Sequence, residues 1–167
     1  TACIQSRLGA MRLENRRIIA VRNVHRAFLN SCVLLGLDVE WIMPDYTDGI
    51  LSGAVNAAVV EKLLAENPQS CLYVTSPDYT GKIADIPSLA AICKKYNAKL
   101  LVDNAHGAHL HFFPESMHPI ALGAEAQAQI AEDPKHRPAQ FRIIRHFRFV
   151  TDVIVSVIAD VTLLAGL

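Results

Sequence analysis

The chain has 167 residues, 51% of them apolar, so it is long enough to bury the core of one domain. Sixteen basic residues balance sixteen acidic ones, which gives no electrostatic reason to expect nucleic acid or an anionic membrane as a partner. Four cysteines lie far apart without a CxxC pair, a pattern typical of free thiols in the cytoplasm. The first residues show no signal-peptide pattern and already have helical spacing, so we interpret the chain as a piece of a longer protein.

The first 124 residues alternate between helix-like and strand-like segments. Apolar spacing predicts helices over 1–14, up to Gly36, over 54–67 and within 85–96, and strands over 17–21, 39–43, 72–74 and 100–102. In the helix over 54–67, the expected buried side consists of Val55, Val59, Leu63 and Leu64. Strands joined by crossover helices form βαβ units. The predicted fold class is therefore α/β, a three-layer α/β/α sandwich with a mostly parallel sheet.

Residues 125–167 differ in character from the preceding chain. Pro134 and Pro138 interrupt a polar, alanine-rich start. Apolar residues from Val150 to Leu164 then fit one helical face. Aspartates on the opposite face would each cost about 2.5–3.5 kcal/mol at a bilayer centre, which favours a packed amphipathic helix over a membrane span. We therefore divide the chain into an α/β part, 1–124, and a divergent tail, 125–167, that is predicted to be helical.

Polar side chains follow several of the predicted strands. His25 comes soon after the first strand, Ser76 follows the third, and Asp103 ends the fourth, with His106 close behind. In parallel sheets, ligands bind beyond the carboxyl ends of the strands. The sequence therefore predicts a site at this edge, although His25 taken alone favours a local hydrogen-bonding role.

The histidines after Asp103 raise the alternative of a metal site. His106, His109 and His111 are residues that zinc accepts as ligands, but the HxxHxH spacing is loose and does not place all three on one side of a helix. We favour histidines of a polar loop and predict no metal.

Asp103 suits a different task, the binding of a protonated pyridine nitrogen. A carboxylate that keeps this nitrogen charged turns the ring of pyridoxal phosphate into an electron sink. Ala105 is small enough to let a ring lie against the backbone, and His25 is placed to stack on the other face. Thr1 stands at a helix start, where free N–H groups attract phosphate, although a plain helix cap explains it equally well.

Three motifs occur in order: RN-x-H at 22–25, TSP-x-Y-x-G at 75–81 and D-x-AHGAH at 103–109. With the opening TACIQ, they resemble the Orn/Lys/Arg decarboxylase family of fold type I pyridoxal phosphate enzymes over about residues 1–124. The resemblance implies that 1–124 is a partial cofactor-binding large domain. It also implies a cytoplasmic lyase that removes the α-carboxylate of ornithine, lysine or arginine to give polyamines or their precursors. The expected partner is thus a basic amino acid, and the full-length protein is expected to form a homo-oligomer.

The resemblance also implies a role for each matching residue. Thr1 would lie at the cofactor phosphate, His25 on one face of the ring and Ala105 on the other. Asp103 would bind the pyridine nitrogen and His106 would lie beside the cofactor. His25 and His106 would be the catalytic residues, and Ser76 would be a further cofactor neighbour.

The family pattern breaks after residue 124. Members carry a Ser-x-His-Lys motif there, whose lysine forms the Schiff base with the cofactor, whereas this chain reads EAQAQIAEDPKHRPAQ over 125–140. Lys135-His136 has the reverse order and lies between prolines. Two hypotheses follow: a fragment of a decarboxylase, or an inactive remnant that acts only as a binding or interaction module. A nucleotide-binding module is disfavoured, because neither GxGxxG nor GxxxxGK[ST] occurs.

Overall fold

The computed structural model describes residues 2–46 and 53–128. The elements in chain order are α1 (Ala2–Leu13), β1 (Ile18–Val21), α2 (Arg26–Leu35), β2 (Val39–Ile42), β3 (Asp45–Tyr46), β4 (Gly53–Ala54), α3 (Ala57–Glu66), β5 (Cys71–Thr75), α4 (Ile86–Lys95), β6 (Lys99–Asp103), the 3₁₀ helix η1 (Ala108–Phe112) and β7 (Ala126–Ala128). Helices and strands alternate through most of this length, as the sequence predicts.

A five-stranded sheet with the order β2-β1-β5-β6-β7 forms the centre of the molecule. All neighbouring strands in it are parallel, whereas β3 and β4 form a separate antiparallel pair. Parallel neighbours need a crossover connection, and α2 and α4 supply two of them. The strands β1 and β5 are short and buried along their whole length, as expected of a sheet covered on both faces.

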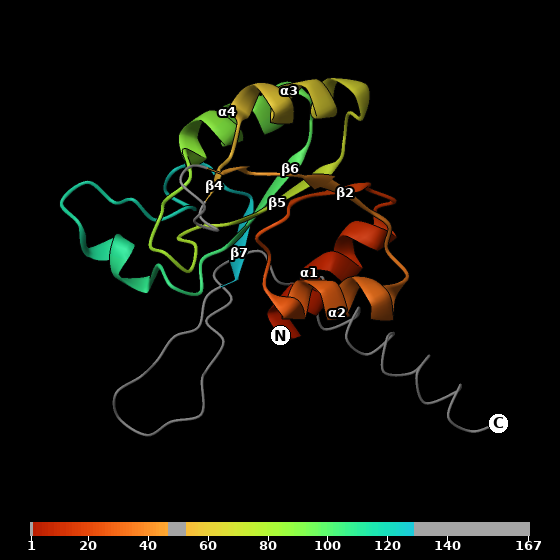
Figure 1. The fold of residues 1–167 in the computed structure, drawn as a ribbon, viewed down its shortest axis with the longest axis horizontal. Helices are drawn as coiled ribbons and strands as arrows, with labels where there is room; N and C mark the ends of the chain where they lie inside the picture. The colour runs from red at the N-terminus through yellow and green to blue at the C-terminus, as the bar shows by residue number, and fades with distance from the viewer. Residues whose placement is uncertain (1, 47–52, 129–167) are drawn as a thin grey trace.

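The helices cover the sheet in two layers (Figure 1), with α1 and α2 on one face and α3 and α4 on the other. Alternate residues of each strand point to opposite faces, so two cores form. The core under α1 and α2 includes Leu8, Phe28, Ala20, Tyr73 and Leu101. The core under α3 and α4 includes Val60, Leu64, Leu72, Leu89 and Val102. The predicted three-layer α/β/α sandwich is confirmed.

Two helix ends follow the predicted signals. α2 ends at Gly36, whose φ of 59° lies in the left-handed region that glycine adopts most easily. α4 begins after Asp85, whose side chain accepts a hydrogen bond from the Ser88 N–H at 3.1 Å. Local chemistry therefore determines where these two helices stop and start.

The buried face of α3 differs from the sequence prediction at one residue. Asn56 caps the helix by accepting from the N–H groups of Ala58 and Val59, so the helix starts three residues later than predicted. Val60 and Leu64 are its buried residues, whereas Val59 is 43% exposed. Leu64 is buried as predicted, and Val55 and Leu63 pack against the same core. Packing against the sheet therefore changes the prediction only at Val59, whose neighbour Val60 is buried instead.

The first described residues of the tail form a strand. Ala126–Ala128 pairs in parallel with β6, with Ala126 opposite Leu101 and Ala128 opposite Asp103. This differs from the helix predicted there, because the edge of β6 offers unpaired backbone N–H and C=O groups that a neighbouring segment can satisfy. The predicted helical face from Val150 to Leu164 lies outside the described residues. Within the described part, every helix is too short or too polar to cross a bilayer.

Candidate functional site

The carboxyl ends of β1, β5 and β6 bring the predicted residues to one edge of the sheet. The chain leaves β1 through α2 toward β2 on one side, and leaves β5 through α4 toward β6 on the other. In such sheets the binding crevice opens where the connections diverge, here between β1 and β5. His25 follows β1, Ser76 follows β5 and Asp103 is the last residue of β6. The predicted placement of these three residues is confirmed.

Asp103 is a buried carboxylate, with 4% of its surface exposed. Its Oδ2 accepts a hydrogen bond from the Tyr73 hydroxyl at 3.2 Å, and its Oδ1 accepts from the Ala105 N–H at 3.3 Å. None of the ion pairs among the described residues involves Asp103. A buried carboxylate without a cation is costly unless a ligand supplies the charge, so Asp103 fits a cationic ligand group.

Tyr73 and Thr75 share the sheet face of Asp103 but were not predicted as site residues. Thr75 lies opposite Asp103 in the register of β5 and β6, and its buried Oγ1 has no hydrogen-bond partner among the described residues. The same holds for the buried Oδ1 of Asn23, just after β1. The period-two alternation of a strand would have identified Tyr73 and Thr75, because both have the parity that faces α2.

His25 caps the start of α2. Its Nδ1 accepts the Ala27 N–H at 3.0 Å, so the neutral ring carries its proton on Nε2. The ring is exposed. Phe28, one turn further along, contacts the ring of Tyr73, which connects this end of α2 to the Asp103 hydrogen bond. The local role that the sequence favoured for His25 is confirmed, and the ring remains accessible to a ligand.

Ala105 and His106, which follow β6, differ in burial and in their contacts. Ala105 is half-buried, and its backbone N–H holds Asp103. His106 is exposed and packs against the ring of Tyr79, with 5.3 Å between ring centroids. Ala105 is therefore an integral part of the carboxylate site, whereas His106 lies at its outer surface.

Ser76 is buried and holds a loop. Its backbone N–H donates to the Asp103 carbonyl at 3.0 Å, and its Oγ accepts the Ala84 N–H at 3.0 Å. Within that loop, Asp78 Oδ1 accepts from the N–H groups of Thr80 and Lys82. These contacts give Ser76 a structural function, the fixing of the segment that crosses the end of β5.

Gly107 lies where the backbone passes very close to its neighbours. A Cβ at this position would lie 2.7 Å from both Asn104 Cγ and Pro77 Cδ. We expect Gly107→Ala to lower the free energy of unfolding by about 1–3 kcal/mol, because overpacking forces such neighbours apart. Thermal unfolding measures this effect. Gly9→Ala is the matched control, since a Cβ there meets nothing within 4 Å, and it should leave stability equal or higher. Equal melting shifts in the two variants would contradict the close approach at Gly107.

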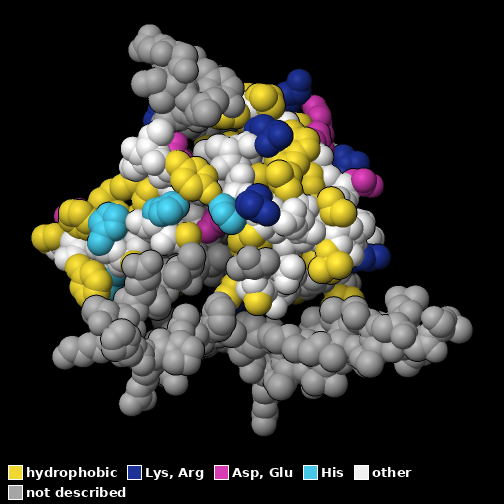
Figure 2. Space-filling view, turned by 60° about the horizontal axis from the view of Figure 1, so that its bottom comes forward, with side chains coloured by type: hydrophobic (Ala, Val, Ile, Leu, Met, Phe, Trp, Pro, Cys, Tyr) yellow, Lys and Arg dark blue, Asp and Glu magenta, His cyan; other side chains and the backbone are white. Residues whose placement is uncertain are grey.

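Exposed histidines form part of the surface near η1 (Figure 2), with hydrophobic side chains around them. His109 contacts Phe113, and His111 contacts Phe112 and His118. No group of three or more metal-ligating side chains comes together among the described residues. His109, His111 and His118 therefore make aromatic contacts near the surface.

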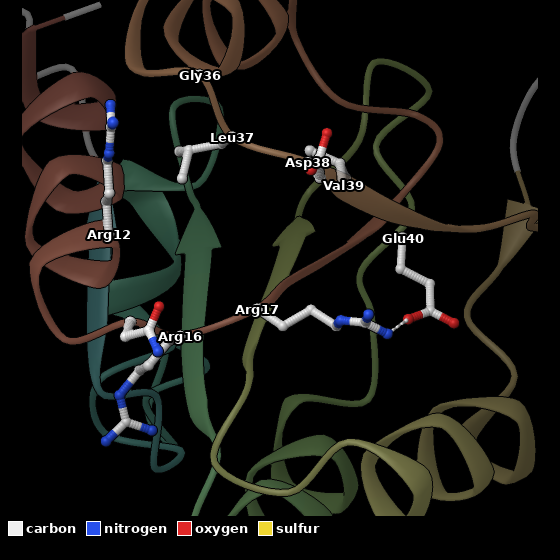
Figure 3. A pocket seen from close by; sticks show the side chains of 9 residues that line it. Arg12, Arg16, Arg17, Gly36, Leu37, Asp38, Val39 and Glu40 are labelled. Atoms are coloured by element: carbon white, nitrogen blue, oxygen red, sulfur yellow. Dashed lines mark hydrogen bonds and ion pairs between the residues drawn. The ribbon is translucent and has the colours of Figure 1, made fainter.

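A cleft lies at the opposite edge of the sheet (Figure 3). It has a volume of about 610 Å³ and is lined by Arg12, Arg16, Arg17, Asp38 and Glu40, among others. Arg17 pairs with Glu40 at 3.1 Å, Arg16 donates to two backbone carbonyls, and Arg12 donates to the Leu35 carbonyl. These arginines make structural contacts within the chain, so we place the candidate functional site at Asp103 and not in this cleft.

Thr1, expected at the cofactor phosphate, lies outside the described residues, as do Lys135 and His136 of the tail. Nothing in the structure bears on their roles.

The residues around Asp103 fit the pyridine ring that the sequence predicts. Asp103 offers a buried anion to a ring N–H, and Thr75 offers an unpaired hydroxyl beside it. The family model for Orn/Lys/Arg decarboxylase, major domain, matches residues 2–136. The chain belongs to the Orn/Lys/Arg decarboxylase family. The match extends twelve residues beyond the limit of 124 that the motifs gave, and it includes β7.

The relatives that this chain resembles are much longer than the chain itself. The chain is 32% identical over 124 residues to the arginine decarboxylase of Bacillus subtilis (strain 168), an overlap of 72% of this chain and 24% of that protein. It is 27% identical over 107 residues to a probable L-aspartate decarboxylase of Pyrococcus furiosus, covering 63% of this chain and 27% of the relative. The chain thus spans about a quarter of the length of these relatives.

Solved structures show the same fold. The sphingosine-1-phosphate lyase Bpss2021 of Burkholderia pseudomallei K96243 superimposes with a TM-score of 0.60 and 22% identity, over 76% of this chain and 31% of that one. Oryza sativa TDC with PLP gives a TM-score of 0.58 and 14% identity, over 76% and 30%. At such identities the likeness establishes the fold alone. It confirms the predicted architecture, that of the large domain of fold type I enzymes.

Proposed function

We propose that this chain is part of the cofactor-binding large domain of a pyridoxal phosphate-dependent decarboxylase of basic amino acids. One observation carries the proposal: Asp103, at the carboxyl end of a central parallel strand, is a buried carboxylate held by two donors and lacking a cation among the described residues. A pyridinium N–H supplies the missing positive charge. Family membership supports the same cofactor.

The chain's own residues would divide the binding of the cofactor among them. Asp103 would hold a proton on the ring nitrogen. His25, fixed by its cap to α2, would present its exposed ring to one face of the cofactor, and Ala105 would lie against the other. His106 would lie beside the cofactor and Thr1 at its phosphate. When bound, pyridoxal phosphate supplies an electron sink for the electron pair left behind by the departing carbon dioxide.

The substrate class is part of the proposal. Ornithine, lysine and arginine are the amino acids in the description of the family, and several relatives are named arginine decarboxylase. Other relatives are named for aspartate. The amino acid named as substrate therefore varies among homologues that share this part of the chain. A cytoplasmic enzyme acting in polyamine formation is the corresponding proposal for the complete protein.

Binding of pyridoxamine 5′-phosphate to this chain tests the proposal. The amine keeps the pyridine nitrogen and the phosphate but has no aldehyde, so its binding does not depend on a lysine. We expect saturable binding of one molecule per chain in equilibrium dialysis. Absence of saturable binding would overturn the assignment of the cofactor site.

The second candidate, an inactive remnant that only binds, is favoured by the absence of Ser-x-His-Lys from the 167 residues. Incubation with pyridoxal phosphate, reduction with borohydride and peptide mapping distinguish it from an enzyme. A single dominant adduct, for example at Lys135, would show that the tail supplies a substitute lysine. Scattered labelling over the six lysines would favour the binding module.

A further inference from the structure

Tyr73 is a buried core side chain whose hydroxyl contacts the proposed cofactor site. It lies in the middle of β5, opposite Leu101 in the register with β6 and two residues before Thr75. Its hydroxyl bonds Asp103 Oδ2 at 3.2 Å. The fold therefore places a phenol hydroxyl within hydrogen-bonding distance of the carboxylate that is expected to bind the cofactor.

The hydroxyl is the donor in this hydrogen bond, because an ionised carboxylate can only accept. Burial raises the pKa of the Tyr73 hydroxyl above its ordinary value, and the neighbouring Asp103 carboxylate raises it further. The phenol therefore keeps its proton at neutral pH and continues to donate it toward Asp103.

The ring of Tyr73 is held by aromatic packing. Phe28 of α2 lies 4.3 Å from it between ring centroids, and Trp41 of β2 lies 6.0 Å from Phe28 in an edge-on arrangement. Arg22 lies over the other end of this row, 5.2 Å from the Trp41 ring. Because the row rests on two strands and a helix, the position of the Tyr73 hydroxyl is set by the core and not by a loop.

We propose that Tyr73 is a positioning residue that keeps the Asp103 carboxylate ionised and aimed at the cofactor nitrogen. This inference rests on the proposed function. A carboxylate has about four lone-pair sites; Tyr73 takes one on Oδ2 and the Ala105 N–H takes one on Oδ1. When the cofactor is bound, its ring N–H would donate to one of the remaining sites of the carboxylate that these two donors orient.

Tyr73 also determines where the shared proton lies. A hydrogen bond donated to the charged form of a carboxylate favours that form. With Tyr73 in place, the proton between Asp103 and the ring nitrogen therefore stays on the nitrogen. Loss of the hydroxyl makes the carboxylate a stronger competitor for this proton, which weakens the electron sink without removing any direct contact to the cofactor.

The test uses pyridoxamine 5′-phosphate labelled with ¹⁵N in the ring, bound to the full chain at neutral pH. The ¹⁵N chemical shift reports whether the nitrogen carries a proton. We expect a protonated nitrogen in the original protein. In Tyr73→Phe, which keeps the ring and its packing, we expect a shift toward the unprotonated value and affinity lower by about tenfold, the size of one hydrogen bond to a charged group.

Tyr96→Phe is the matched control. Tyr96 packs against the core on the opposite face of the sheet, and its hydroxyl also lies near a carboxylate, Glu61, at 3.5 Å. This variant should leave both the ¹⁵N shift and the affinity unchanged. A second measurement needs no cofactor: the Asp103 carboxyl ¹³C resonance, in protein labelled at aspartate Cγ, should move in Tyr73→Phe and stay in Tyr96→Phe.

The outcomes separate the inference from the proposed function. If the original protein binds the ligand and Tyr73→Phe gives the same ¹⁵N shift and affinity, Tyr73 has no positioning role and the cofactor assignment stands. An unmoved Asp103 ¹³C resonance likewise overturns the inference. If the original protein does not bind the ligand, the proposed function fails and the role of Tyr73 fails with it.

Discussion

Replacement of Asp103 by alanine should abolish measurable binding of pyridoxamine 5′-phosphate. The carboxylate is the buried anion at the site, and removal of one partner of a buried charge pair costs about 3–5 kcal/mol, which corresponds to a loss of two orders of magnitude or more in affinity. Equilibrium dialysis with the ligand at increasing concentration measures this loss.

Asp103→Asn separates charge from shape. The amide oxygen can still accept the Ala105 N–H, and the amide NH2 that replaces Oδ2 can donate to the Tyr73 hydroxyl. The variant should therefore fold normally and still lose most of its affinity. Asp38→Asn serves as the control, because Asp38 is exposed at the opposite edge of the sheet, and it should bind as the original protein does. Unchanged affinity in both Asp103 variants would show that this carboxylate does not hold the ring nitrogen.

Replacement of Phe28 by alanine should lower the free energy of unfolding by about 3–5 kcal/mol, as truncation of a buried aromatic residue does. Phe28 is fully buried and contacts the rings of Tyr73 and Trp41. Urea unfolding followed by circular dichroism measures the change. Because Phe28 also supports the ring of Tyr73, the folded fraction of this variant should bind the cofactor more weakly.

Leu34→Ala is the control on the same helix. Leu34 is 69% exposed, and leucine and alanine both have high helix propensity, so its removal should change the free energy of unfolding by less than about 0.5 kcal/mol. A similar loss in Leu34→Ala and Phe28→Ala would contradict the assignment of the inner face of α2.

Part of the site could be predicted from the sequence because its signals are local. A strand that ends on Asp103 and continues into Ala105 and His106 predicts polar groups at the carboxyl edge of a parallel sheet, and the structure places them there. A local hydrogen-bonding role could be predicted for His25 as well as a functional one, because a side chain just before a helix has few possible partners. Gly36 and Asp85 mark helix ends for equally local reasons.

Other features depend on contacts between distant parts of the chain. Tyr73 and Asp103 are thirty residues apart, and an apolar run such as CLYVT gives no sign that one hydroxyl will find a carboxylate. Ser76 looks like a site residue, but its hydroxyl is used to hold Ala84. The tail after residue 124 is predicted to be helical, but Ala126–Ala128 pairs with the edge of β6.

The order of the four helices and of the first four strands of the main sheet, the α/β class and the importance of Asp103 follow from the sequence, because apolar periodicity, caps and short motifs act between residues that are close in the chain. Tertiary packing determined that Val60 and not Val59 is buried on α3, that 126–128 extend the sheet, and that the Tyr73 hydroxyl meets Asp103. Each of these features depends on the order of the strands in the sheet. That order is set by the simultaneous burial of both faces of the sheet, to which residues distant in the chain contribute.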